Sequence, residues 1–252
     1  MSDSHILVDR PQQAPGVLTI RFNRPEKKNA ITTAMYRRMA AAVEEASADP
    51  AIRAVLFLGT EGCFSAGNDL ADFLAFAETN PTEPPAAFVF LKALALCEKP
   101  VVSGVDGLAI GIGTTLNLHC DLTFASDRSL FKTPFVDLGL VPEAGSSLLG
   151  PQAMGHQRAF ALLAASEGFS AEEARAAGIV WKVVAPDQVE PQALAAAARL
   201  ASRPAEALRI TRDLLRGDRI GLLARMDEEL HHFTERLKSD EARAAFQTFL
   251  KR

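Results

Sequence analysis

Apolar and polar positions along the first 135 residues form patterns that predict strands followed by helices. The run Val17–Phe22 (VLTIRF) has the pattern of a strand, and Asn23-Arg24-Pro25 ends it before a helical pattern begins. This succession repeats, with strand patterns at residues 53–58, 101–105, 122–125 and 130–132 and helical patterns at 33–47, 69–78, 85–97 and 111–119. Residues 59–67 are expected to form a loop. The alternation favours an α/β fold with parallel or mixed sheets covered by helices.

After a strand pattern at residues 181–185, the periodicity becomes purely helical, over residues 192–201, 205–215, 220–237 and 241–250. The third of these helices has more apolar positions than an isolated helical hairpin can bury: Leu222, Leu223, Met226, Leu230, Phe233 and Leu237. We therefore predict two parts, a core over residues 1–185 and a C-terminal helical module over residues 186–252. The module is expected to dock on the core or on a neighbouring subunit.

Composition narrows the class of function. With 252 residues, 48% of them hydrophobic, the chain can bury a sizeable core. The net charge of −4 argues against nucleic acid as the main partner, because phosphate backbones are bound by an excess of Lys and Arg. The three cysteines, Cys63, Cys97 and Cys120, are widely spaced and fit a reducing compartment better than a disulfide framework.

The sequence has no recognisable targeting or membrane segment. Residues 1–16 lack an apolar signal region, and no stretch approaches the roughly 18 apolar residues of a membrane span. The last residues, Leu250-Lys251-Arg252, differ from the peroxisomal Ser-Lys-Leu signal. We expect a cytoplasmic protein that does not enter a membrane.

Two glycine-containing turns combine a strand pattern with a following helical pattern. In residues 63–70 (CFSAGNDL), the backbone N–H of Asn68 could face a ligand, although a simple glycine turn capped by Asn68 or Asp69 is the alternative. Residues 104–115 (GVDGLAIGIGTT) lack the third glycine of a dinucleotide-binding loop and the Lys-Ser/Thr of a phosphate-binding loop. Two amide-presenting turns together suit an oxyanion, for which each donor contributes roughly 3–4 kcal/mol.

A third segment, residues 134–147, places Glu143 in an apolar loop directly after Pro142. Burial there would raise the pKa of its carboxyl group and suit a general base. The alternative is a glutamate at a helix N-terminus, stabilised by the helix dipole.

Taken in order, these motifs resemble the enoyl-CoA hydratase/isomerase, or crotonase, superfamily. The likeness includes residues 23–30 (NRPEKKNA), 64–70, 99–102 (KPVV), 104–113 and 138–145, and it extends to residues 239–241 and Phe249. The resemblance implies a crotonase (ClpP-like) spiral of repeated ββα units with a C-terminal helical trimerisation module. It also implies an acyl-CoA thioester substrate, a homotrimer or dimer of trimers, and no metal or cofactor apart from the coenzyme A of the substrate.

The resemblance also assigns the site. Glu143 stands where Δ3-Δ2-enoyl-CoA isomerases of the peroxisomal type carry their catalytic glutamate, and the backbone amides of Asn68 and Ile112 would form the oxyanion hole. The predicted substrate-binding residues are Lys27, Lys28, Ala66, Gly67, Asp69, Leu70, Gly111, Phe135, Leu138, Phe249 and Lys251. Phe73 and Phe76 are further candidates for an acyl tunnel. The alternatives are solvated surface charge for the lysines and simple core for the apolar residues.

The family's hydratases use two glutamates, whose places here hold Thr115 and Phe135. Neither side chain can act as a general base at neutral pH, so the expected reaction is a double-bond shift from C3 to C2 with Glu143 as the single base. Three alternatives stay open: a hydratase that uses Glu143 with water, an aryl-CoA dehalogenase with a nucleophilic carboxylate, and a non-catalytic acyl-CoA-binding or RNA-binding relative. His119, Cys120, His231 and His232 are interpreted as structural.

Overall fold

Two sheets form the framework of the protein in the computed structural model, which describes residues 5–72 and 84–250. In the larger sheet the spatial order is β1 (Ile6–Asp9), β2 (Val17–Phe22), β3 (Ala54–Leu58), β5 (Val101–Val105), β7 (Leu122–Ser126) and β10 (Lys182–Val184). In the smaller it is β4 (Cys63–Ser65), β6 (Leu108–Ile110), β8 (Leu130–Lys132) and β9 (Phe169–Ser170). Among the strands of the described residues, β1–β2 and β8–β9 pair antiparallel and the other neighbours pair parallel. The predicted α/β class with mixed sheets is confirmed.

From β3 to β8, successive strands alternate between the two sheets. The chain places β3, β5 and β7 in the larger sheet and follows each directly with β4, β6 or β8 in the smaller one. This alternation builds the expected spiral of ββα units. The prediction of a loop over residues 59–67 was wrong in part, because β4 lies inside it. A strand of three residues is too short to leave a clear periodicity in the sequence.

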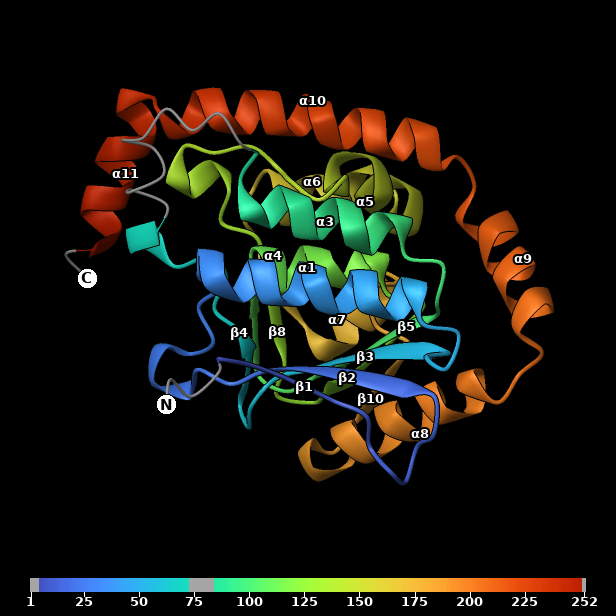
Figure 1. Ribbon diagram of the computed structural model, residues 1–252. Helices are drawn as coiled ribbons and strands as arrows, with labels where there is room; N and C mark the ends of the chain where they lie inside the picture. The colour runs from blue at the N-terminus through green and yellow to red at the C-terminus, as the bar shows by residue number, and fades with distance from the viewer. Residues whose placement is uncertain (1–4, 73–83, 251–252) are drawn as a thin grey trace.

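Helices enclose the sheets (Figure 1). The helices are α1 (Thr33–Ala48), α3 (Ala86–Leu96), α4 (Ile112–Thr115), α5 (Ser146–Met154), α6 (His156–Leu163), α7 (Ala171–Ala176), α8 (Val189–Ala201), α9 (Ala205–Arg216), α10 (Arg219–Leu237) and α11 (Asp240–Leu250). Short 3-10 turns are η1 (Pro25–Lys27), η2 (Leu116–His119), η3 (Val136–Leu138) and η4 (Pro186–Gln188). Of the helix predicted at residues 69–78, residues 70–72 are helical and residues 73–78 lie outside the described part.

The larger sheet is buried on both faces, which explains its continuous apolar strands. Along β3, Val55 and Phe57 belong to the apolar cluster shared with α1 and α3, whereas Leu56 and Leu58 belong to the cluster shared with α8. Figure 1 shows α8 on one side of this sheet and α1 and α3 on the other. Helix α8 therefore packs on the core although it lies within the predicted C-terminal module.

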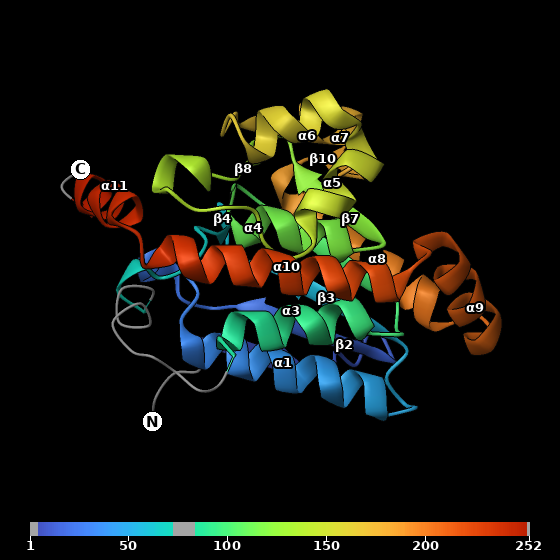
Figure 2. The same ribbon diagram turned by 90° about the horizontal axis from the view of Figure 1, so that it is seen from above.

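The three remaining C-terminal helices surround the core rather than extend it. Helix α10 lies alongside α3 and contacts α5, and α11 contacts η3 (Figure 2). Helix α9 lies at the edge of the molecule, and Leu214, Leu215 and nearby Ile220 are about four-fifths exposed. In the described part of the chain, none of the helices combines the length and the apolarity that crossing a membrane requires.

Candidate functional site

The two glycine-containing turns lie side by side because the strands before them are parallel neighbours. Strands β4 and β6 pair through Cys63 with Leu108 and Ser65 with Ala109. A Cβ atom added to Gly67 would lie 3.0 Å from the carbonyl oxygen of Ile110. The two backbones therefore approach as closely as glycine permits.

Each turn leaves a backbone donor at the same edge of the smaller sheet. Gly111 has φ 57° and ψ −119°, a conformation that favours glycine, and Ile112 begins α4 directly after it. The first N–H groups of a helix have no intrahelical acceptor. In the described residues, neither the N–H of Ile112 nor that of Asn68 donates a hydrogen bond. The structure thus brings together the two donors predicted for an oxyanion hole.

Glu143 is buried, with 4% of its surface exposed, in the loop before α5. The hydroxyl of Thr115 donates a hydrogen bond to its carboxylate, with 2.5 Å between Oγ1 and Oε1. Burial raises the pKa of Glu143 to about 8, and the nearby charge of Glu229 acts in the same direction, whereas the hydrogen bond from Thr115 opposes both. A carboxyl group with such a pKa is present in both protonation states near neutral pH.

Tyr36 of α1 contacts Asn68 and lies near Glu143. Its hydroxyl donates a hydrogen bond to Oδ1 of Asn68 at 2.5 Å. Burial raises the pKa of Tyr36 well above its ordinary value, and the charge of Glu143 adds to the effect, so the hydroxyl stays protonated at neutral pH. The sequence analysis missed this residue, because nothing in the helical pattern of α1 separates Tyr36 from its apolar neighbours.

A cavity of about 1110 Å³ opens beside the two turns. It is lined by nine of the predicted residues: Lys27, Ala66, Gly67, Asn68, Asp69, Leu70, Gly111, Phe135 and Leu138. Ile112, Glu143 and Lys28 do not line it. Helix α11 contributes one wall through Phe246 and Thr248. Of the other predicted residues, Phe249 has a side chain outside the described part, and Phe73, Phe76 and Lys251 lie outside it entirely.

Two polar features of this cavity were missed. Lys132 lines it at the end of β8, beside β6, and adds a second cation to Lys27. Arg24 pairs with the partly buried Asp69, with 2.7 Å between Nη1 and Oδ2, so this carboxylate is held by the protein and its pKa is lowered. The position of Lys132 at the end of a predicted strand, like those of the two turns, is the signal that could have identified it.

A smaller pocket of about 170 Å³ lies between α1, α3 and α10. Tyr36, Phe88, Phe233 and Leu237 are among its lining residues, and Phe233 also lines the larger cavity. Its lining is mostly apolar. It therefore suits a hydrocarbon chain rather than a charged group.

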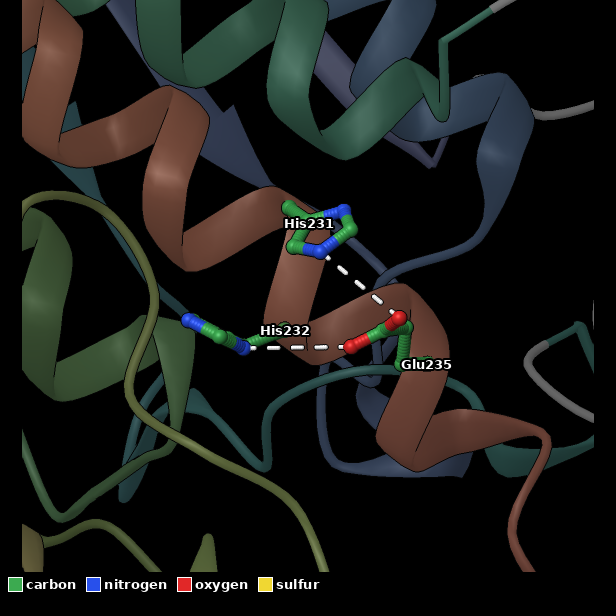
Figure 3. Close-up of side chains that lie close together, drawn as sticks. All are labelled: His231, His232 and Glu235. Atoms are coloured by element: carbon green, nitrogen blue, oxygen red, sulfur yellow. Dashed lines mark ion pairs between the residues drawn. The ribbon is translucent and has the colours of Figure 1, made fainter.

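One group of side chains in the described residues has the composition of a metal site. His231 and His232 of α10 both lie close to Glu235, with 3.6 Å and 3.8 Å between ring nitrogens and carboxylate oxygens (Figure 3). All three side chains are more than half exposed, and they lie on the outer surface of one helix. Exposed groups of this kind are ordinary surface ion pairs, consistent with the structural interpretation of both histidines.

Comparisons with known proteins identify the family of the chain. A family model described as enoyl-CoA hydratase/isomerase matches residues 12–252. The chain is 36% identical to enoyl-CoA delta isomerase 2 of Rattus norvegicus and of Homo sapiens, over 94% of its own length in each case. It spans only 62% and 61% of those two curated relatives. The structure of Pseudomonas aeruginosa OdaA superposes with a TM-score of 0.93 at 41% identity, covering 99% of this chain and 100% of that one.

Proposed function

The chain belongs to the enoyl-CoA hydratase/isomerase family, and we propose that it is an enoyl-CoA isomerase that moves a double bond from C3 to C2 of its substrate. The observation that carries the proposal is the buried carboxylate of Glu143, which accepts a hydrogen bond from Thr115, the residue that stands where the family's hydratases have a glutamate. The pattern of similarity to delta isomerases supports the same reaction.

The reaction needs one group that accepts and returns a proton. Ionised Glu143 removes a proton from C2 of a 3-enoyl-CoA, and the electron pair moves into the thioester to give a dienolate. The N–H groups of Asn68 and Ile112 donate hydrogen bonds to the enolate oxygen, each contributing roughly 3–4 kcal/mol. Protonated Glu143 then returns the proton to C4, and the double bond now joins C2 and C3. No atom is gained or lost.

The environment of Glu143 suits this shuttle. A pKa of about 8 lies close to neutral pH, so the same carboxyl group is an adequate base in the first half of the reaction and an adequate acid in the second. The nearby Glu229 is not available as a second base, because three hydrogen bonds from residues 145 and 147 occupy its two oxygens.

The cavities fit the two ends of an acyl-CoA. Lys27 and Lys132 would face the phosphates of coenzyme A in the larger cavity, and the apolar pocket between α1, α3 and α10 would receive the acyl chain. Glu143 lines neither space, so binding must move side chains that separate it from the thioester.

We also propose assembly as a homotrimer or dimer of trimers, for which the exposed Leu214, Leu215 and Ile220 offer an apolar surface.

Assays with two substrates distinguish an isomerase from a hydratase, which is the other activity in the family's name. Purified protein should convert trans-3-hexenoyl-CoA to the 2-enoyl isomer, measured by absorbance of the conjugated thioester and by chromatography. Crotonyl-CoA should be hydrated at least about 100-fold more slowly, since both glutamates of the two-carboxylate route are replaced here, by Thr115 and Phe135. Rapid hydration without a double-bond shift would overturn the proposal, and binding without turnover of either substrate would favour a non-catalytic relative.

A further inference from the structure

The loop that carries Glu143 has an unusual backbone. Ala144 has φ 63° and Gly145 has φ 67°, so two consecutive residues directly after Glu143 are left-handed. For alanine this conformation costs roughly 1–2 kcal/mol. Such a turn persists only where its surroundings hold it.

Glu229 of α10 is the main group that holds this turn. One carboxylate oxygen accepts a hydrogen bond from the N–H of Gly145 at 2.6 Å. The other accepts bonds from the N–H and the hydroxyl of Ser147, at 2.9 Å and 2.6 Å. In the described residues, Glu229 has no ion pair with a basic side chain. Burial raises the pKa of Glu229, whereas the hydroxyl of Ser147, the N–H groups of Ser147 and Gly145 and the charge of Arg225 all favour its ionised form.

Packing joins α10 to the same turn. A Cβ atom added to Gly145 would lie 2.4 Å from Cδ1 of Leu222 and 3.3 Å from Cγ of Met226, and both residues belong to α10. On the other side, the ring Nε2 of His119 lies 2.7 Å from the carbonyl oxygen of Ala144. The backbone next to Glu143 is thus fixed between η2 and α10.

From these contacts, and resting on the proposed function, we propose that Glu229 is a positioning residue for Glu143. Its carboxylate holds the left-handed turn against α10 and thereby fixes where the base lies relative to the substrate carbons. Misplacement of a catalytic group by about 1 Å is enough to lower a rate by about 100-fold. Through Glu229, the helix α10 would therefore contribute to the rate, although the side chain of Glu229 does not touch the substrate.

The charge of Glu229 gives the proposal a second, separable consequence. The titratable groups around the Glu143 loop are Tyr36 from α1, His119 from η2, which contacts the carbonyl of Ala144, and Glu229 from α10, and Arg225, one turn before Glu229, lies near Ser147. Burial keeps His119 neutral, with its pKa lowered to about 4, and Tyr36 protonated. When ionised, Glu229 is the one anion among these neighbours. Loss of its charge should move the acidic limb of the rate profile to lower pH.

Three variants test the proposal. Glu229→Gln removes the charge and places an amide group against N–H donors, so kcat should fall about 10- to 100-fold with KM changed less than about threefold. Its acidic limb should move to lower pH. Glu229→Asp keeps the charge but shortens the side chain, so kcat should fall while the limb stays at its wild-type pH. Ser147→Ala removes one of the three hydrogen bonds and should lower kcat about two- to fivefold.

Glu235→Gln is the matched control, because it removes an exposed carboxylate from the same helix. It should leave kcat, KM and the pH profile unchanged. Wild-type values of kcat and of the acidic limb in folded Glu229→Gln and Ser147→Ala would overturn the proposal. Equal shifts of the limb in Glu229→Gln and Glu229→Asp would overturn the role of the charge.

An infrared titration makes the test independent of turnover. The carboxyl band lost in Glu143→Gln identifies Glu143, and its midpoint should fall in Glu229→Gln relative to wild type. If wild-type protein fails to isomerise 3-enoyl-CoA, the proposed function fails and this titration alone decides: a lower midpoint supports the link between the two carboxylates, and an unchanged midpoint rejects it.

Discussion

The two halves of the site are positioned in different ways. The oxyanion turns follow β4 and β6, and pairing between neighbouring strands brings their amides together. The Glu143 loop is held by side chains from η2 and α10, and Glu229 lies 84 positions beyond Gly145 in the chain. Backbone pairing between strands therefore fixes the electrostatic half of the site, whereas side-chain contacts fix the acid–base half. Substitutions in the two halves should therefore impair the activity of the protein in different ways.

The largest effect is expected at the acid–base half. Glu143→Gln keeps the size of the side chain and an acceptor for Thr115 but cannot take a proton, so kcat for trans-3-hexenoyl-CoA should fall about 1000-fold or more. Binding of the acyl-CoA, measured by calorimetry, should change little. The exposed Glu167→Gln serves as control and should match wild type. Undiminished turnover in Glu143→Gln would show that another group is the base.

A substitution that disturbs the backbone should impair the oxyanion half of the site. Gly111→Ala adds a methyl group that meets no atom closer than 4.0 Å, so its cost comes from the φ of 57°. We expect thermal stability to fall by about 1–3 kcal/mol and kcat by about 10- to 100-fold.

Gly217→Ala is the control for that experiment. Gly217 has φ 72° and ψ −137°, angles similar to those of Gly111. It lies between α9 and α10, and an added Cβ atom would meet no atom within 4 Å. The two variants should lose similar stability, measured by thermal unfolding, but only Gly111→Ala should lose rate. A comparable rate loss in both would mean that kcat follows stability and not the position of the Ile112 amide.

Tyr36 tests whether the oxyanion half also depends on a side-chain contact from α1. Tyr36→Phe removes the hydrogen bond to Asn68, worth about 1 kcal/mol, so kcat should fall about fivefold. Ser47→Ala, near the far end of the same helix, removes a hydroxyl group that bonds only to the carbonyl of Val43 and should leave the rate unchanged. In a double-mutant cycle with Gly111→Ala, coupling would sharpen the assignment of Tyr36 to the oxyanion half. Strict additivity would argue against it.

The smallest expected effect is on stability. The folded-state pKa of Glu143 is about 8 and its ordinary value is 4.5, so between these pH values the unfolded chain releases a proton that the folded chain keeps. The stability contributed by this raised pKa is present below about pH 4.5 and is lost as pH rises to about 8. Glu143→Gln cannot ionise, so the difference between its melting temperature and that of wild type should rise as pH increases over this range. A difference independent of pH would contradict the raised pKa.

Sequence reasoning predicted the framework and the backbone donors because both follow from local patterns. Strands 101–105 and 130–132, and the turns at Gly67 and Gly111, carry their signals in adjacent residues. Glu143 was identified by its apolar loop and by resemblance. The environment of that carboxyl group was not predictable, because Tyr36, Thr115 and Glu229 reach it from three separate segments.

Short elements and distant pairs account for the rest. The short strands β4 and β6 were not recognised in the sequence, and no element was predicted at β1 or at α5 through α7. The pairing of Arg24 with Asp69 joins residues 45 positions apart and has no sequence signature. Polar residues of this kind become recognisable only when the fold brings them together.

The position of α10 and α11 in the chain also bears on synthesis. A nascent chain completed to about residue 201 already contains the sheets and the helix α8 that covers one face of the larger sheet. It would lack Glu229 and the cavity wall around Phe246, so the turn after Glu143 would keep only its contact with His119. A ribosome-bound intermediate of this length would therefore contain the oxyanion donors without the α10 contacts that position the base.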